Sequence, residues 1–279
     1  MFKDKTTVLL VAALSLGSVT PTLATPLFGT SFGGLERAVL YDVDPQTGLA
    51  TNPRPTGINH LVGIAFSPGG TLYGLSNAAA AENPNSLFTI DPETGAPSLV
   101  DAIGLDNVVE GDLAFDPTTS VLYGLYNLDS GQRQLLTIDT DTATATVIPG
   151  SLTGDPSGMA FDSTGMLYAL DTSLRQLLTV DKTTGAILTT TALSAALGSV
   201  AGMDVDPATG TLYVADGESD GTDTLYTLNP TTGVLTEVGP TGLPDGLAGL
   251  AFVPEPTTLL MMMLGGAALM RRRMRQEKT

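Results

Sequence analysis

The 279-residue chain has no cysteine, no tryptophan and a single histidine, His60. The lack of cysteine excludes a disulfide framework and thiol chemistry. Basic residues are also scarce, because 12 Lys and Arg stand against 29 Asp and Glu, giving a formal net charge of −17. Helical periodicity is nearly absent from the body of the chain, so the sequence favours an all-β protein.

The shortage of basic residues is greatest between the two ends, residues 1–24 and 254–279. That body retains five Lys and Arg against 26 Asp and Glu, a balance of −21. So acidic a body is a poor partner for nucleic acid or an anionic membrane and a good one for cations. The alternative is that many of these acids form turns, because Asp-Pro-x-Thr-Gly sequences recur along the chain.

One stretch, residues 158–185, shows how the body is built. It contains short apolar runs at 158–161, 166–170 and 177–180, separated by turns rich in Asp and Gly, and a fourth run follows at 186–190. Runs this short, with β-branched and aromatic residues between turn residues, predict β-strands. The stretch therefore predicts a unit of four strands.

The unit repeats along the chain. Its first strand ends at Phe66, Phe115, Phe161, Val205 and Phe252, in steps of 49, 46, 44 and 47 residues. A period near 45 with four strands per unit is typical of a β-propeller blade. An open solenoid of the same repeats is the alternative.

The two ends of the body complement each other. Leu27-Phe28-Gly29 matches a second strand and residues 39–43 match a third, while residues 249–252 supply an innermost strand. The sequence therefore predicts a five-bladed propeller over residues 27–253, closed by the N-terminal strands together with the C-terminal strand, which removes the exposed edges that a linear array would leave. Residues 52–59, with Pro53 and Pro55, are expected to be a loop.

The innermost strands predict a candidate site at the axis. One face of these strands carries mostly Gly and Ala, which lets neighbouring blades pack closely, and Asp112 and Asp204 depart from that rule. Other polar residues enter the innermost strands from several blades and could hold a divalent cation. The axial candidates are His60, Glu110, Asp112, Asp155, Asp204 and Asp245.

The strand order over residues 27–252 resembles that of NHL-type propellers and metal-dependent lactonases. The resemblance is at the level of the repeat, and the lactonase ligand set has no residue-by-residue match here. No Ser–His arrangement is visible, and the only lysine of the body, Lys182, lies in a predicted surface turn.

An acidic loop is a second candidate for metal binding. Residues 216–223 read DGESDGTD, with oxygen ligands at alternate positions as at the start of a calcium loop. The twelfth position is Thr227 and not Glu, which excludes an EF-hand. Calcium is thus the one cofactor considered, and a solvated acidic turn is the alternative. The candidate ligands are Asp216, Glu218, Asp220 and Asp223.

Both ends of the chain predict export. Lys3 and Lys5 precede the apolar run 8–16, and Thr22-Leu23-Ala24 has the form of a cleavage site, so residues 1–24 are predicted to be a signal peptide cleaved after Ala24. At the other end, Pro-Glu-Pro is followed by an uncharged apolar run at 257–270 and an arginine cluster. The sorting elements are Pro254, Glu255, Pro256, Arg271, Arg272, Arg273 and Arg275.

The C-terminal pattern resembles the PEP-CTERM sorting signal. The resemblance implies a bacterial substrate of an exosortase, a membrane protease. The apolar helix is short for a full span, which fits a transient inner-membrane anchor with the propeller outside, followed by transfer to the envelope surface or the medium. A permanent tail anchor is the alternative.

Three functions are compatible with these features. The first is a non-catalytic envelope or extracellular-matrix propeller that binds polysaccharide, protein or calcium. The second is a metal-dependent, lactonase-like hydrolase that uses the axial carboxylates. The third is a purely structural surface protein. The directions of Asp112 and Asp204 discriminate the second from the others.

Overall fold

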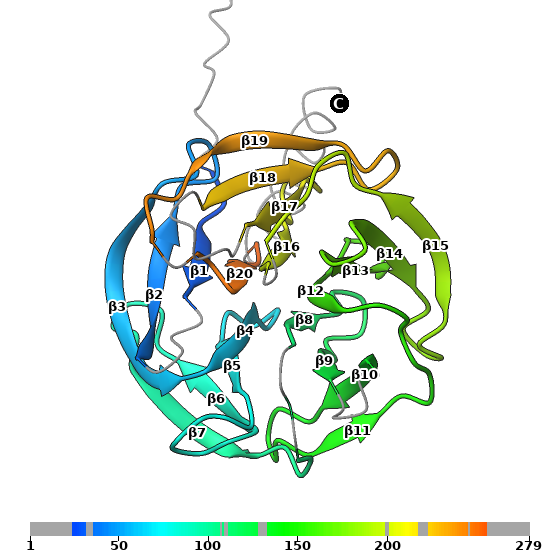
Figure 1. Cartoon of the computed structure of the whole chain (residues 1–279). Helices are drawn as coiled ribbons and strands as arrows, with labels where there is room; N and C mark the ends of the chain where they lie inside the picture. Colours follow the sequence, from blue (N-terminus) through cyan, green and yellow to red (C-terminus); the bar gives the residue numbers. More distant parts are fainter. Residues whose placement is uncertain are drawn as a thin grey trace, which may run out of the picture.

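The computed structural model describes residues 24–31, 36–106, 108, 111–127, 133–198, 201–216, 223–244 and 246–255. These residues form five four-stranded antiparallel sheets placed as blades around one axis (Figure 1). The predicted all-β, five-bladed propeller is therefore confirmed. Residues 1–23 of the predicted signal peptide and the predicted C-terminal helix at 257–270 fall outside the described residues, and within those residues no helix has the length and apolar character to span a membrane.

Each blade is described from its innermost strand outward. The closing blade contains β20 (Gly249–Phe252), β1 (Leu27–Thr30), β2 (Arg37–Val43) and β3 (Ala50–Asn59). The second blade contains β4 (Leu61–Phe66), β5 (Leu72–Ser76), β6 (Ser86–Ile90) and β7 (Pro97–Ala102). The third contains β8 (Leu113–Phe115), β9 (Leu122–Asn127), β10 (Arg133–Ile138) and β11 (Ala145–Val147). The fourth contains β12 (Pro156–Phe161), β13 (Leu167–Asp171), β14 (Gln176–Val180) and β15 (Ile187–Ala192). The fifth contains β16 (Met203–Val205), β17 (Leu212–Ala215), β18 (Thr224–Leu228) and β19 (Leu235–Pro240).

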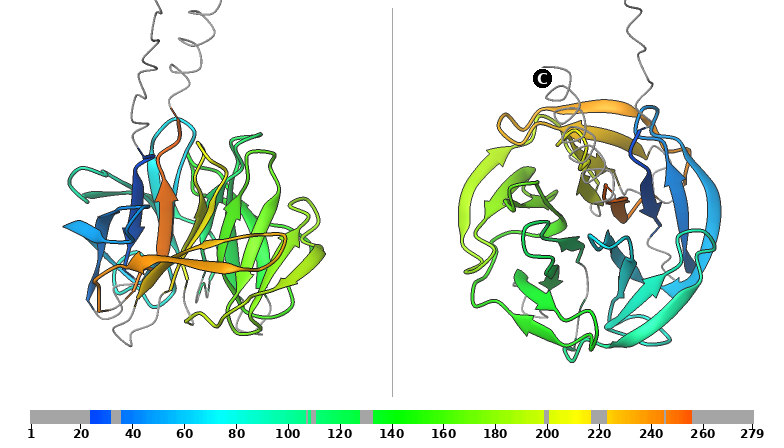
Figure 2. Two further views of the ribbon diagram at one scale, coloured as in Figure 1. Left: turned by 90° about the horizontal axis from the view of Figure 1, so that it is seen from above. Right: turned by 180° about the vertical axis from the view of Figure 1, so that it is seen from behind.

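The ring closes as the sequence predicts. β20 pairs antiparallel with β1, so that Phe252 lies opposite Leu27 and Gly249 opposite Thr30. Beyond the strands, Val253 N donates a hydrogen bond to Pro26 O at 2.9 Å. Both ends of the propeller consequently leave from the same face of the disc, which we call the terminal face (Figure 2).

The prediction of a loop at residues 52–59 is wrong. The segment belongs to β3, the outermost strand of the closing blade. Proline cannot donate a ladder hydrogen bond, but an edge strand has a free side on which no donor is needed, so Pro53 and Pro55 are tolerated there. Between them, the largely buried Arg54 side chain forms an ion pair with Asp42 and lies 5.3 Å from the centre of the Phe28 ring.

The turns between the third and fourth strands show why Asp and Gly recur. In the second blade, Asp91 Oδ1 accepts hydrogen bonds from Glu93 N at 2.8 Å and Thr94 N at 3.2 Å. Gly95 N donates to Asp91 O at 2.8 Å, and Gly95 has a φ of +76°, which favours glycine. Ala143 occupies the corresponding position in the third blade with a φ of +57°.

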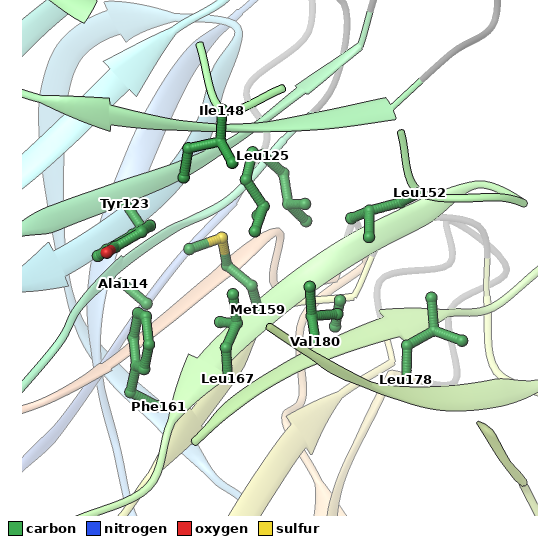
Figure 3. Packing of buried hydrophobic residues seen from close by; sticks show 12 residues of the cluster. Ala114, Tyr123, Leu125, Ile148, Leu152, Met159, Phe161, Leu167, Leu178 and Val180 are labelled. Carbon is green, nitrogen blue, oxygen red and sulfur yellow. The ribbon is translucent and has the colours of Figure 1, made fainter. Parts of the chain in front are cut away.

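The core lies in the seams between blades. A ring from the second strand of one blade meets the phenylalanine that ends the innermost strand of the next blade. These pairs have ring centres 5.1–5.6 Å apart and are Phe28–Phe66, Tyr73–Phe115, Tyr123–Phe161 and Tyr213–Phe252. Figure 3 shows the third-to-fourth seam, where Met159 and Leu167 pack beside the Tyr123–Phe161 pair. Such pairs add to the energy of burial and align adjacent blades.

Candidate axial site

The innermost strands approach one another closely through their glycines. A Cβ atom built on Gly63 of β4 would lie 2.6 Å from Asp112 Oδ1 and 2.7 Å from Asp112 Cα in the third blade. One built on Gly202 would lie 2.7 Å from the carbonyl carbon of Gly249. These separations are shorter than van der Waals contact, so the glycines are required by backbone packing around the axis.

Asp112 occupies the position that is glycine in the other four innermost strands, which we call the glycine row, and its side chain is fully buried. Its Oδ1 accepts a hydrogen bond from Leu113 N at 2.8 Å. Its Oδ2 accepts one from Met159 N, also at 2.8 Å, in β12 of the fourth blade. The carboxylate therefore joins the third blade to the fourth.

Asp204 has the same arrangement in the fifth blade, two residues later in the repeat than Asp112. Its Oδ1 accepts a hydrogen bond from Val205 N at 2.8 Å, and its Oδ2 accepts one from Phe252 N at 2.7 Å. Phe252 ends β20, so Asp204 joins the fifth blade to the closing blade. Both acidic departures from the small-residue rule are thus contacts between blades.

Burial dominates the protonation of both groups. It raises the pKa of Asp112 well above the usual range, against the opposing hydrogen bonds from Met159 and Leu113, and the negative charge of Asp204 raises it further. Burial likewise raises the pKa of Asp204 to about 7, although the Phe252 and Val205 amides favour its ionised form.

His60 and Asp155 lie at the starts of innermost strands but are engaged differently. His60 links β3 to β4 with a φ of +55°, and its carbonyl oxygen accepts a hydrogen bond from Asn77 N at 3.0 Å. Asp155 forms an ion pair with Arg133 of the third blade. The Asp155 amide also donates to Asp171 Oδ2 at 3.1 Å.

Arg133 is a residue that the sequence analysis missed. Its side chain is almost fully buried at the start of β10, and its ion pair with Asp155 holds the third and fourth blades together. The available signal was the rarity of basic residues, since only five occur in the body. A basic residue retained at the start of an apolar strand is a candidate for a buried ion pair.

The acidic loop at 216–223 is described only at its ends. Asp216 Oδ1 accepts a hydrogen bond from Gly198 N at 2.7 Å, and the Asp223 side chain is buried. Glu218 and Asp220 lie outside the described residues, as do the axial candidates Glu110 and Asp245. The calcium site therefore stays a prediction.

Pro254 and Glu255 follow the closing strand after Val253, and Glu255 is exposed. The remaining sorting residues lie outside the described part of the chain, and these are Pro256, Arg271, Arg272, Arg273 and Arg275.

Among the described residues, no three His, Asp or Glu side chains come together as a metal site. The structure brings Asp112 and Asp204 within electrostatic influence of each other, whereas Asp155 pairs with Arg133. A groove of about 530 Å³ on the fifth blade is lined by Gly210, Thr211, Leu212, Thr227, Leu228, Asn229, Pro230, Thr232, Val234 and Thr236. None of these side chains is an acid or a base at neutral pH.

Comparison with solved structures finds proteins of similar fold. A protein of unknown function from Bacteroides caccae is 10% identical with a TM-score of 0.52, covering 83% of this chain and all of its own. A candidate gluconolactonase is 16% identical with a TM-score of 0.51, covering 81% of each chain. A gluconolactonase from Xanthomonas campestris is 16% identical with a TM-score of 0.48, covering 78% of this chain and 77% of its own. At these identities the likeness concerns the fold alone, and no curated protein matches the sequence.

Two family models match the sequence. The PEP-CTERM protein-sorting motif covers residues 252–275, so the predicted sorting signal is confirmed. This motif marks an exported protein that is anchored transiently in the membrane and processed by an exosortase. A model described as a repeat of unknown function, DUF6923, covers residues 112–261, which is more than half of the chain. The chain therefore belongs to the DUF6923 repeat family and carries a PEP-CTERM sorting motif at its C-terminus.

Proposed function

We propose that this protein is a non-catalytic propeller of the cell envelope or extracellular matrix, which binds an extracellular polysaccharide or protein after sorting. The observation that carries the proposal is that Asp112 and Asp204 form hydrogen bonds between blades. All four of their carboxylate oxygens accept backbone hydrogen bonds, and in each residue one of the two bonds crosses to a neighbouring blade.

A metal-dependent hydrolase needs a different arrangement. Its carboxylates must direct free lone pairs at a cation or at a water molecule. Asp112 is fully buried, so turning its carboxylate toward a cation or water would break its bond to Met159 N and leave a buried amide without an acceptor, at a cost of about 1–3 kcal/mol. The raised pKa values of Asp112 and Asp204 have the same structural cause, since burial between blades is their largest contribution.

The position of the chain ends favours one face of the disc for binding. Both ends leave from the terminal face, and the sorting motif begins at residue 252, inside the closing strand (Figure 2). While the chain is anchored, the terminal face is directed to the membrane. The opposite face, which carries the loop at 77–85 and the turn at 172–175, is directed away and is available to a partner.

The test assays the purified, exported protein with a gluconolactone in the presence of millimolar calcium or zinc. We expect hydrolysis at the rate of the buffer alone, with Asp112→Asn and Asp204→Asn lowering only stability. Co-sedimentation with extracellular polymer of the producing cells should retain the folded protein and not the urea-unfolded control. Metal-dependent turnover that disappears in both variants would establish the hydrolase instead.

A further inference from the structure

We propose that removal of the signal peptide after Ala24 creates a functional group, an N-terminal ammonium on Thr25 that forms an ion pair with Asp206 and locks the seam of the ring. The inference rests on export, which the sorting motif supports, and is independent of whatever partner the propeller binds.

Thr25 is already placed against Asp206. The Thr25 hydroxyl donates a hydrogen bond to Asp206 Oδ1 at 2.8 Å, and the two residues are only 9% and 7% exposed. Thr25 leads into β1 of the closing blade, while Asp206 begins the turn after β16 of the fifth blade. The contact thus joins chain segments 181 residues apart across the seam where the ring closes.

The backbone nitrogen of Thr25 lies within about 7 Å of the same carboxylate, because it belongs to the residue whose hydroxyl contacts Asp206. Within one threonine the backbone N and Oγ1 are separated by three bonds, which places them about 3–4 Å apart. The next residue is fixed, because Pro26 O accepts the hydrogen bond from Val253 N at 2.9 Å. The preceding residue, Ala24, is exposed and so leaves the scissile bond accessible.

Cleavage changes the charge at this point. Hydrolysis of the Ala24–Thr25 peptide bond consumes one water, whose oxygen enters the Ala24 carboxylate while the Thr25 nitrogen becomes an amine. The amine then takes a proton from solvent, because an α-amino group has a pKa of about 7.7–8.0. A neutral amide beside Asp206 is thereby replaced by a cation.

The third blade contains the same contact with a lysine. Asp116 occupies the position in its turn that Asp206 occupies in the fifth blade, and it receives the Lys182 ammonium of the next blade at 2.5 Å. Burial alone would raise the pKa of Asp116, but hydrogen bonds from Lys182 and from Thr118 and Thr119 outweigh it and lower that pKa to about 2. Asp206 has the same turn bonds, from Ala208 N at 2.9 Å and Thr209 Oγ1 at 2.8 Å. The new N-terminus supplies the ammonium that Lys182 supplies to Asp116.

The experiment compares two forms of the full chain after export. One uses the natural leader, and mass spectrometry should identify Thr25 as its first residue. The other uses a foreign leader with its own cleavage site, fused directly to Ala24, so that Ala24 comes first and its ammonium is displaced by about 3.8 Å. Pulse proteolysis in urea then measures the folding equilibrium constant of each form. We expect Asp206→Asn to lower that constant about tenfold more in the Thr25-first form than in the Ala24-first form.

The control is Asp162→Asn, which removes the matching turn carboxylate of the fourth blade and should affect both forms equally. The Thr25-first form should also lose its advantage as pH rises from 8 to 10, because the ion pair raises the pKa of the ammonium and its stabilisation is lost as the proton leaves. Should Asp206→Asn fail to fold, this pH comparison of the two unsubstituted forms decides. A first residue other than Thr25, a difference under threefold, or equal pH profiles would overturn the inference.

Discussion

Asp112 Oδ2 in the third blade accepts a hydrogen bond from the backbone nitrogen of Met159 in the fourth blade, at 2.8 Å. Asp204 repeats the relationship with Phe252 N at 2.7 Å, between the fifth blade and the closing blade. In both cases a carboxylate extends beyond its own sheet and bonds an amide at the free inner edge of the next one. These bonds hold neighbouring blades together at the axis. The innermost strand is the last of its sheet, so the inward amides have no neighbouring strand to accept their hydrogen bonds.

Stability should fall between about pH 4 and pH 7. The pKa of Asp204 is about 7 in the folded protein, mainly through burial, and its ordinary value is 3.8, so the folded state holds more protons than the unfolded state in this range. Deprotonation should therefore cost about 2–4 kcal/mol as pH rises. Urea unfolding across pH 3–8 measures this slope, which Asp204→Asn should reduce, leaving the part contributed by Asp112, whose pKa is also raised by burial.

The matched control for that profile is Asp91→Asn. Hydrogen bonds from Glu93 and Thr94 lower the pKa of Asp91, so its contribution is present above the unfolded pKa and is lost only as pH falls below it. The Asp91 variant should keep the wild-type slope between pH 4 and pH 7. Parallel profiles for wild type and the Asp204 variant would contradict the assignment.

Gly63→Ala should destabilise the protein by about 3 kcal/mol. Its Cβ would lie 2.6–2.8 Å from Asp112 and Leu113 atoms of the third blade, and two of these three atoms belong to the backbone and cannot rotate away. Gly69→Ala is the control, since its Cβ would meet only Ser67 Oγ at 3.7 Å. Thermal unfolding of the two variants should differ by many degrees, and equal melting temperatures would show that the axis has room.

Ser120→Gly should stabilise the protein by about 0.5–1 kcal/mol. Ser120 is exposed and has a φ of +60°, which costs a residue with a Cβ atom about 1–2 kcal/mol and glycine much less, although glycine gains more freedom on unfolding. Gly210 occupies the same place in the fifth blade with a φ of +72° and no atom near its would-be Cβ. Gly210→Ala should accordingly destabilise by a similar amount. Urea midpoints that move in the same direction would refute the strain argument.

Calcium should raise the melting temperature if residues 216–223 bind it. A ligand that binds only the folded form at a hundredfold excess over its dissociation constant adds about 2.7 kcal/mol. Replacing Asp216 and Asp220 with Asn should abolish the shift. Sodium at equal ionic strength is the control, because screening also stabilises an acidic surface. A shift that sodium reproduces, or that the double variant keeps, identifies an ordinary acidic turn.

The repeat itself carries most of the fold. Five blades follow from a period near 45 with four apolar runs per unit. The closure by β1 and β20 follows from the complementary ends at Leu27 and Phe252. These features are local or periodic, so they can be counted along the chain. The glycine row was predictable for the same reason, because five strands around one axis leave no space for side chains on one face.

The tertiary structure decided what the polar residues do. The sequence does not distinguish an aspartate that binds a cation from one that accepts an amide hydrogen bond. The partner of Asp112 lies 47 residues away along the chain. The burial of Arg133, the strand at Pro53 and Pro55, and the contact of Thr25 with Asp206 likewise depend on which blade or edge lies alongside. The packing of strands and blades around the axis creates these neighbours, and the energy of a buried charge depends on them more than on the residue type.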